Sequence, residues 1–488
     1  MNYVDVTLAT RAYTAGRGIR SCTVRHRRLV PKPIAVVLWQ LGAEPFAPAA
    51  IGWGDDHSKP HMAIAGEPRN RDLAFAALLK FAKWFNAKFE PHYEDRETLT
   101  TKNYTIKVAR TAPQVIVANK ATVEFLGRLG RRLAYLPTEG SQAASSELIR
   151  LGRHCRFLRD HFEVPGQQLI VALTDLMNAH WATPQSREER ESLSALDAFI
   201  DPPEGLSGFE AAAIAELYPV GPIADGDDEQ QLIRLVEQFN KARKGSTAAG
   251  VVNPHLGPIK AHYQPLLRRA WDLLWRCRDR EAKLAEAKSV GRRWDADRQD
   301  YTRHIDWLDR NGLQRTRQTP RQAAMTFRNW EEAGRLVEAE EACDDPLRMA
   351  GYVLNNKAVR GEVVAVDSGH KEQGPKRKVT RPLVTLRSPD PCLIPVGREL
   401  WWTKQSAGKE YVVTEISSRP DGGSDVTLKL MTSTKSIPLP SVGMTECFSD
   451  HSTESRDFFN KLPKDAPWTH QASVPLAVPE PIEEITEV

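Results

Sequence analysis

The spacing of apolar residues changes along the chain and separates regions of different predicted structure. In residues 1–140, short apolar runs such as "YVDVTLA", "IAVVLWQL" and "HMAIAG" are separated by Gly, Pro and Asp, as in a meander of β-strands. The stretches "NRDLAFAALLKFAKWFNAKFE" and "ATVEFLGRLGRRLAYL" instead place apolar residues three and four apart, which predicts helices. We therefore expect an N-terminal domain that mixes α-helices and β-strands.

Helical spacing dominates residues 141–245, which predicts a helical middle domain. The stretches "SSELIRLGRHCRFLRDHF", "GQQLIVALTDLMNAHWA" and "DGDDEQQLIRLVEQFNKARKG" each carry an apolar stripe. The last of them begins with acidic residues and ends with basic residues and a glycine, which suits the helix dipole and a glycine C-cap. Residues 246–258 are small, contain Gly and Pro and lack charge, so we interpret them as a linker.

Residues 259–357 predict a long helical hairpin. The seam of a coiled coil is indicated by residues at alternating spacings of three and four, although Glu281 weakens it: Leu267, Ala270, Leu274, Cys277, Glu281 and Leu284. The stretch "NGLQRTRQTPRQ" interrupts this pattern, and "RQAAMTFRNWEEAGRLVEAEEA" resumes it. Two long antiparallel helices joined at the interruption satisfy both observations.

Residues 358–448 change to a period of two, which predicts a small β-barrel. Five runs of about six to eight residues alternate in polarity and are joined by turns such as "DGGSD". A barrel of the OB or SH3-like kind accounts for five short strands and one long connection. Residues 449–488 form a Pro-rich, acidic tail that we expect to be disordered. The predicted fold class is thus multidomain α+β: an α/β-mixed N-terminal domain, a helical middle, a helical hairpin and a C-terminal barrel.

The amino-acid composition indicates where in the cell the protein works, but it does not indicate what the protein does. The chain has 488 residues, of which 27% are charged and 41% hydrophobic, and its best apolar run is about half as long as a bilayer span requires. Six cysteines stand far apart without a CxxC pair, which favours a reducing compartment and argues against a zinc or iron–sulfur site. We expect a cytoplasmic protein with no cofactor and no membrane partner.

Positive charge is concentrated in two places, although the net charge is only +4. The stretch "GHKEQGPKRKVTRP", residues 369–382, connects the first two predicted barrel strands and carries Lys371, Lys376, Arg377, Lys378 and Arg381. The predicted hairpin carries Arg276, Arg280, Arg292, Arg293, Arg315 and Arg317, with tryptophans between several of the arginines. Arginine pairs with phosphates and aromatic rings stack on bases, so these residues are our predicted nucleic-acid-binding set. A solvated charged helix and a loop kept basic for solubility are the competing interpretations.

Two long helices that lead into a β-barrel resemble the accessory stalk and barrel of superfamily 1 helicases, over residues 259–448. The resemblance implies that this region touches nucleic acid beside a motor. The chain contains no GxxxxGK[ST] pattern, so a motor is absent or belongs to a separate protein, and we do not expect this chain to hydrolyse ATP.

A metal-dependent nuclease is the enzymatic alternative. The stretch "GWGDDHSKPH" offers Asp55, Asp56, His57 and His61, residue types that bind divalent metals, and a bound metal would activate water for hydrolysis. Asp5 on a first strand, followed by a meander and a helix, also resembles a ribonuclease-H-like order, with Asn119 where an acid is expected after a later strand. A polar turn between strands is the favoured interpretation of the first stretch.

The leading hypothesis is a non-enzymatic nucleic-acid-binding accessory component of a multi-protein assembly, working with a separate helicase or ATPase. The expected partners are nucleic acid and other protein subunits. The third hypothesis is a structural adaptor whose basic surfaces meet acidic proteins. Phosphates are common to DNA and RNA, so the sequence leaves the choice between them open.

Overall fold

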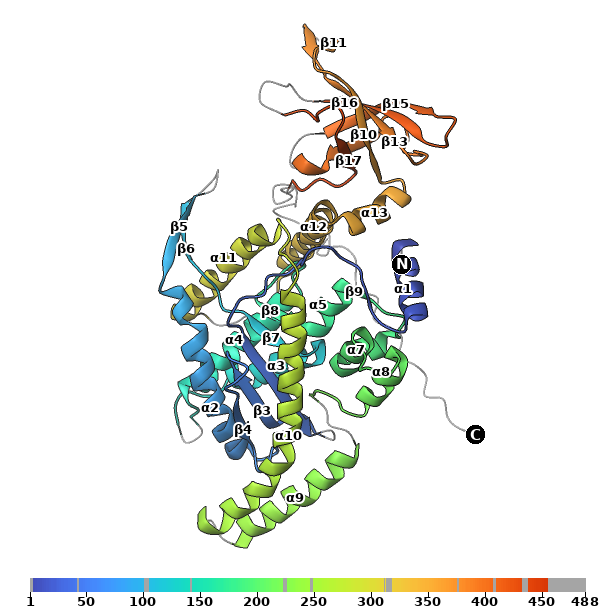
Figure 1. Ribbon diagram of the computed structural model, residues 1–488. Helices are drawn as coiled ribbons and strands as arrows, with labels where there is room; N and C mark the ends of the chain where they lie inside the picture. The colour runs from blue at the N-terminus through green and yellow to red at the C-terminus, as the bar shows by residue number, and fades with distance from the viewer. Residues whose placement is uncertain are drawn as a thin grey trace, which may run out of the picture.

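The computed structural model of the chain describes residues 3–41, 44–100, 105–140, 143–222, 226–245, 249–310, 312, 318–374, 377–406, 410–431 and 438–454. It confirms the predicted fold class, because an N-terminal mixed sheet with helices is followed by a helical middle and a C-terminal antiparallel barrel (Figure 1). Most of the acidic tail, residues 455–488, lies outside the described residues.

A five-stranded mixed sheet forms the centre of the N-terminal part. Its strands are β2 (Ile34–Leu41), β3 (Glu44–Gly54), β4 (His61–Ile64), β7 (Val115–Val117) and β8 (Ile170–Ala172), in the spatial order β4-β3-β2-β7-β8. β2, β7 and β8 run parallel, whereas β3 is antiparallel to both β2 and β4. The parallel pairs need crossover connections, which the helices between these strands supply.

The sheet is buried on both faces, so its central strand is apolar apart from Gln40. All eight residues of β2 are buried. Val36 and Leu38 enter one core cluster, while Val37 and Trp39 enter the other. This two-sided burial explains the nearly continuous apolar run "IAVVLWQL", because alternate side chains of a strand point to opposite faces.

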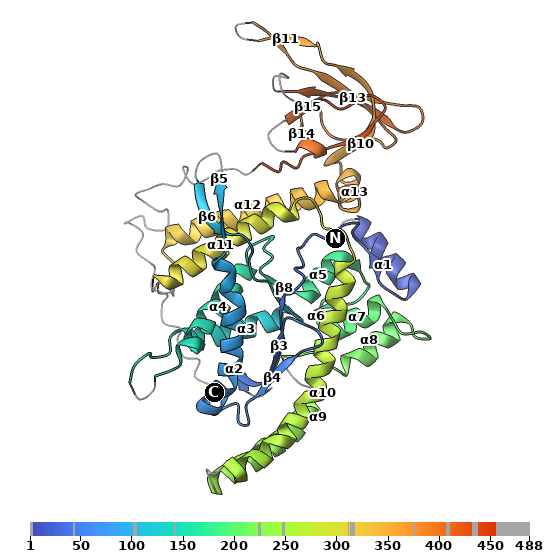
Figure 2. The ribbon, with the colours of Figure 1, turned by 60° about the vertical axis from the view of Figure 1, so that its left-hand side comes forward.

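Helices cover the two faces of the sheet and make three layers (Figures 1 and 2). The first face is covered by α2 (Arg71–Phe89), α3 (Lys120–Ala134), α4 (Ser146–Phe162) and α11 (Val290–Asp309). The second is covered by α5 (Leu173–His180), α7 (Leu193–Ile200), α9 (Gly226–Gly245) and α10 (Ala249–Ala282). The remaining elements of this part are β1 (Ile19–Arg20), η1 (Pro91–Tyr93), β5 (Arg96–Thr100), β6 (Thr105–Ala109), β9 (Trp181–Ala182), α6 (Arg187–Glu191) and α8 (Gly208–Glu216).

Two predictions of local structure were wrong. Residues Tyr3–Ala15 form a helix, α1, and not the strand predicted from "YVDVTLA". Leu8 and Ala12 are its buried residues, four positions apart, and seven residues of partly alternating polarity could not distinguish the two structures. The helix predicted across "GQQLIVALTDLMNAHWA" is preceded by the buried strand β8, which pairs with β7. A three-residue strand buried on both faces has the same apolar run as a buried helix.

The predicted first helix of the hairpin is divided into α10 and α11. α11 forms the antiparallel pair with α12 (Pro320–Asp344), and the two lie side by side in Figure 2. Arg292 and Arg293 near the start of α11 pair with Glu340 near the end of α12, so the two helices run in opposite directions. The apolar seam predicted for a coiled coil belongs instead to α10, where it packs on the second face of the sheet. Coiled-coil spacing and a core-facing helix share this pattern.

The C-terminal barrel is closed by six antiparallel strands in the order β10-β13-β16-β15-β14-β17. The strands are β10 (Ala358–Asp367), β13 (Leu383–Ser388), β14 (Glu399–Trp402), β15 (Glu410–Ser418), β16 (Ser424–Leu430) and β17 (Thr445–Ser449), with η2 (Thr403–Gln405) after β14. Five of them were predicted, and β17 is the additional one. The short helix α13 (Pro346–Leu354) joins α12 to β10 and carries the barrel away from the sheet (Figure 1). None of the described helices is both long and apolar enough to cross a bilayer.

Close contact between α3 and α4 yields a first prediction. A Cβ atom on Gly152 would lie 2.5 Å from the backbone nitrogen of Ala134 and 2.6 Å from Leu133 Cβ. Gly152→Ala should therefore lower the free energy of unfolding by about 1–3 kcal/mol, measured by urea denaturation, because the helices must separate.

Gly291→Ala in α11 is the matched control, because nothing lies within 4 Å of a Cβ built there. Alanine favours a helix over glycine, so this variant should be neutral or more stable by up to about 1 kcal/mol. Equal effects of the two substitutions would contradict close packing at Gly152.

Candidate nucleic-acid interface

The basic connection between β10 and β13 folds as a two-stranded ribbon, which we call the barrel ribbon. It consists of β11 (Lys371–Gln373) and β12 (Lys378–Thr380), paired antiparallel, and it projects beyond the barrel (Figures 1 and 2). At its base the Arg381 N–H donates to the His370 carbonyl at 2.8 Å. Near its tip the Gly374 N–H donates to the Arg377 carbonyl at 3.1 Å. Backbone hydrogen bonds thus hold the ribbon at both ends.

The strand register divides the barrel ribbon into two unlike faces. Lys371 is paired with Thr380 and Gln373 with Lys378, so these four side chains share one face. The other face carries the remaining pair, Glu372 and Val379. Three residues of the first face, Lys371, Gln373 and Lys378, are exposed and Thr380 is half-buried, while both residues of the other face are half-buried. The basic face is therefore the solvent-facing one.

An ion pair turns the second face toward the barrel. Glu372 accepts a hydrogen bond of 2.8 Å from Nζ of Lys429 on β16, and this bond lowers the pKa of the Glu372 carboxyl. The one acid of the ribbon is thereby satisfied by a barrel residue and is turned away from Lys371 and Lys378. Among the described residues, no carboxylate lies within ion-pair distance of Lys371, Arg377 or Lys378.

The structure shows where four of the five predicted loop residues lie. Lys371 and Lys378 lie on the outward face, Arg377 is exposed at the tip and Arg381 is half-buried at the base. Lys376 lies outside the described residues. Sequence reasoning missed Gln373 and Thr380, which share the outward face. Their alternation with Glu372 and Val379 was visible, but it became informative only with the strand register.

The arginines predicted on α10 take part in ion pairs within the chain. Arg276 and Arg280 both bond to Asp197 of α7, Arg276 at 2.5 Å, and Arg280 also reaches Asp201 at 3.0 Å. Asp197 is buried, so these pairs fasten α10 to α7. The tryptophans predicted to stack on bases are also internal, because Trp271, Trp275 and Trp294 are at most 5% exposed.

The arginines predicted on α11 are likewise paired. Arg293 is buried, approaches Glu340 and Glu341, and donates to the carbonyl of His26 at 3.0 Å. Burial is the main cause that lowers the pKa of Arg293 to about 10. Arg292 pairs with Glu340. Arg315 and Arg317 lie outside the described residues. We therefore leave Arg276, Arg280, Arg292 and Arg293 out of the interface.

The candidate metal ligands do not converge. Asp55 pairs with Lys88 at 2.8 Å, His57 lies 2.7 Å from Asp272, and His61 stacks on Trp53. Asp56 accepts hydrogen bonds from the backbone and hydroxyl of Ser58, which lower the pKa of its carboxyl. Within the described part of the chain, no three His, Cys, Asp or Glu side chains are grouped as a metal site requires.

The carboxylates expected from a ribonuclease-H-like order are absent from the positions considered. The first sheet strand is β2, which contains no acid, and Asp5 lies on α1. Asn119, after β7, caps α3 by accepting from the Thr122 N–H at 3.0 Å and donates to the Gly221 carbonyl. Asn119 therefore has a structural role.

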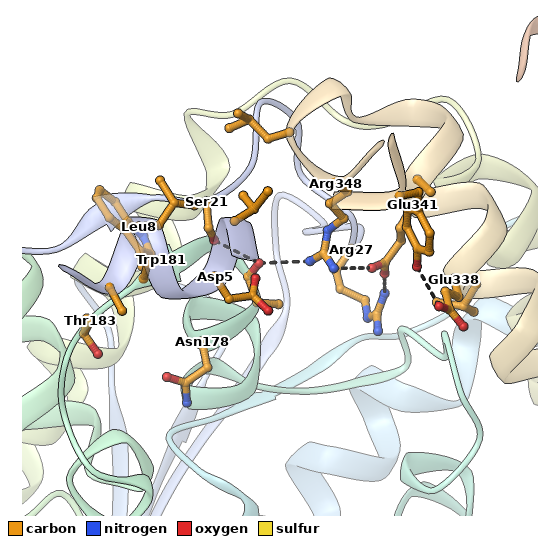
Figure 3. Close-up of a pocket in the computed structure, with 18 of the residues that line it drawn as sticks. Asp5, Leu8, Ser21, Arg27, Asn178, Trp181, Thr183, Glu338, Glu341 and Arg348 are labelled. Atoms are coloured by element: carbon orange, nitrogen blue, oxygen red, sulfur yellow. Dashed lines mark hydrogen bonds and ion pairs between the residues drawn. The ribbon is translucent and has the colours of Figure 1, made fainter. Parts of the chain in front are cut away.

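A cavity of about 730 Å³ lies between α1, α5, α12 and α13 (Figure 3). In its wall Glu341 pairs with both Arg27, at 2.9 Å, and Arg348, at 3.2 Å. Glu338 accepts from the Tyr352 hydroxyl at 2.6 Å. In Figure 3 Arg27 and Arg348 are turned toward Glu341, so these charges are compensated within the wall.

Residues 17–30, which we call the strap, run beside this cavity and cover two buried carboxylates. Glu281 at the end of α10 accepts from Arg20 at 3.0 Å, from the Trp181 indole at 2.7 Å and bonds His180 at 2.6 Å. Burial alone would raise the pKa of Glu281, but its partners outweigh burial and lower it. Asp345, before α13, accepts from the backbone and hydroxyl of Thr23 and contacts His26 at 3.2 Å.

Comparisons of the chain with protein-family models, with curated proteins and with solved structures return no match. The resemblance of residues 259–448 to the stalk and barrel of superfamily 1 helicases therefore remains a prediction.

Because Glu281 is buried and bonded on several sides, we expect its removal to lower the free energy of unfolding strongly. Glu281→Ala leaves Arg20 and His180 without their acceptor and should lower the free energy of unfolding by about 3–5 kcal/mol, measured by urea denaturation. Glu286→Ala is the control, because Glu286 also pairs with a strap arginine, Arg25, but is partly exposed. It should cost about 1 kcal/mol or less. Similar losses in both variants would contradict the special role of Glu281.

A second buried cluster predicts acid sensitivity. His154 and His304 are buried, their ring nitrogens lie 2.9 Å apart, and burial lowers the pKa of both imidazoles. Burial is the larger cause for His304, and the neighbouring His154 and Arg150 add to it. In the unfolded chain both histidines bind protons near their ordinary pKa of about 6.5, while the folded chain keeps them neutral. The free energy of unfolding should therefore fall as the pH drops below about 6.5, by up to about 1.4 kcal/mol per pH unit for each histidine.

His304→Gln tests this assignment, because it removes one of the two titrating groups. Between about pH 6.5 and 5, its free energy of unfolding should fall less steeply than that of the unaltered chain, measured by urea denaturation at each pH. His255→Gln on the exposed side of α10 should leave the steepness unchanged. An unchanged steepness in the His304 variant would show that the acid sensitivity originates elsewhere.

Proposed function

We propose that this chain is a nucleic-acid-binding accessory component of a multi-protein assembly, and that it holds phosphates with the barrel ribbon. The observation that carries the proposal is the outward face of the ribbon, where Lys371 and Lys378 lie beside the exposed Arg377. A polyanion attracts such a group of cations and releases counterions when it binds.

Two features of the ribbon support this assignment over a basic loop kept only for solubility. The cations are held on one face by paired strands, and the single acid of the ribbon is bonded to Lys429 on the barrel. The ribbon also projects away from the sheet and its helices, so a long polymer has access to it (Figure 1). The paired arginines of α10 and α11 contribute by holding the fold.

The nuclease alternative receives no comparable support. Asp55 bonds to Lys88 and His57 bonds to Asp272. Neither β2 nor the first turn of α3 contains a carboxylate. The adaptor alternative shares the basic ribbon with the proposed function, so it becomes one outcome of the test below.

The test measures binding of a fluorescent DNA of about 20 nucleotides, single-stranded and duplex, by anisotropy between about 50 and 200 mM salt. Replacing Lys371, Arg377 and Lys378 by alanine should weaken binding and reduce the slope of log affinity against log salt by about 2–3, since each lost phosphate contact removes about 0.7–0.9.

The control removes the same charge from the opposite end of the molecule. Lys241 and Lys244 on α9 and Lys260 on α10 are exposed. α9 lies at the end of the molecule opposite the barrel (Figure 1). Their joint replacement by alanine should leave the slope unchanged. Equal slopes in both triple variants would place the interface elsewhere, and a chain that binds no nucleic acid at low salt would favour the adaptor.

A further inference from the structure

We infer that the barrel ribbon enters the major groove of duplex DNA, an inference that rests on the proposed function and names its substrate. A two-stranded ribbon has strands about 4.8 Å apart, and three residues per strand extend about 10 Å. The major groove of B-form DNA is about 12 Å wide and 8.5 Å deep and admits such a ribbon, whereas the minor groove is about 6 Å wide.

The chemistry of the outward face suits base edges as well as phosphates. Lysine donates to the O6 and N7 acceptors of guanine, glutamine forms a paired contact with N6 and N7 of adenine, and the threonine methyl can meet the thymine methyl. The face combines these three residue types, with Lys371 beside Thr380 and Gln373 beside Lys378. A surface that only attracted phosphates would not require Gln373 between two cations.

The base of the ribbon restricts how the face can turn. The Lys429 bond to Glu372 holds the opposite face toward the barrel, and the Arg381 N–H bond to His370 closes the ladder at its root. At the tip, a Cβ on Gly374 would lie 2.8 Å from both the Arg377 carbonyl and Val379 Cγ2. The close approach of the strands there keeps the ribbon narrow where it would meet the groove.

Groove geometry then separates DNA from RNA. The major groove of A-form RNA is deep and narrow, so side chains on a ribbon of this width do not reach its base edges. Single strands offer phosphates but no groove. Duplex DNA is consequently the nucleic acid that satisfies both the width of the ribbon and the composition of its outward face.

The experiment compares a DNA duplex of about 20 base pairs, an RNA duplex of the same sequence and the DNA single strand, using the full chain and anisotropy at one salt concentration. We expect the DNA duplex to bind at least about tenfold more tightly than the RNA duplex. Methyl green, which occupies the major groove, should displace the protein, and netropsin, which occupies the minor groove, should not.

A variant separates base contacts from phosphate contacts. Gln373→Ala removes no charge, so it should weaken binding to the DNA duplex about fivefold or more while leaving the salt slope unchanged. Its thermal unfolding should match that of the unaltered chain, because Gln373 is exposed.

The outcomes distinguish the two levels of the proposal. Equal affinity for DNA and RNA duplexes, displacement by netropsin alone, or an unaffected Gln373→Ala variant would overturn the major-groove inference and leave nucleic-acid binding intact. Absence of binding to all three probes would overturn both.

Discussion

The burial of two carboxylates beneath one extended segment holds the parts of this protein together. Glu281 ends α10 and Asp345 begins α13, and the strap supplies both with partners, chiefly Arg20 for the first and Thr23 for the second. Both carboxylates are completely buried. Burying an ionised carboxylate raises the free energy of the folded chain unless all its hydrogen-bond partners are in place. The strap, α10 and α13 are therefore fixed relative to one another.

This arrangement determines where the barrel lies. α12 and α13 carry the barrel, and the strap pairs with the end of α12 through Arg27 and Glu341. Backbone bonds between Arg25 and Ala285 and Ala287 also hold the break between α10 and α11. The barrel is thereby kept away from the sheet, and its ribbon points into solvent (Figure 2). Arg20, Arg25 and Arg27 of the strap serve this scaffold, while the ribbon retains cations that can meet a ligand.

Several elements were predictable because their signal is local. The helix α2 has an apolar stripe and an Asn70 cap that accepts from the Leu73 N–H, and the barrel strands alternate in polarity. The basic connection was also visible as a run of charge. Its faces were not, because they depend on the pairing of Lys371 with Thr380 and Gln373 with Lys378. The strand β8 was missed because burial on both faces removes the alternation that identifies a strand.

The sequence by itself determined the order of the structural classes, the location of the basic connection and the absence of a phosphate-binding loop pattern, since these follow from residue types at short spacing. Only the tertiary structure decided which arginines are available. Arg280 and Arg293 lie in basic stretches of the sequence, as Lys371 and Lys378 do. Their acidic partners come from helices distant in sequence and are Asp197, Glu340 and Glu341. A basic side chain is neutralised when folding brings a carboxylate within a few ångströms of it, and the local sequence pattern does not determine that distance.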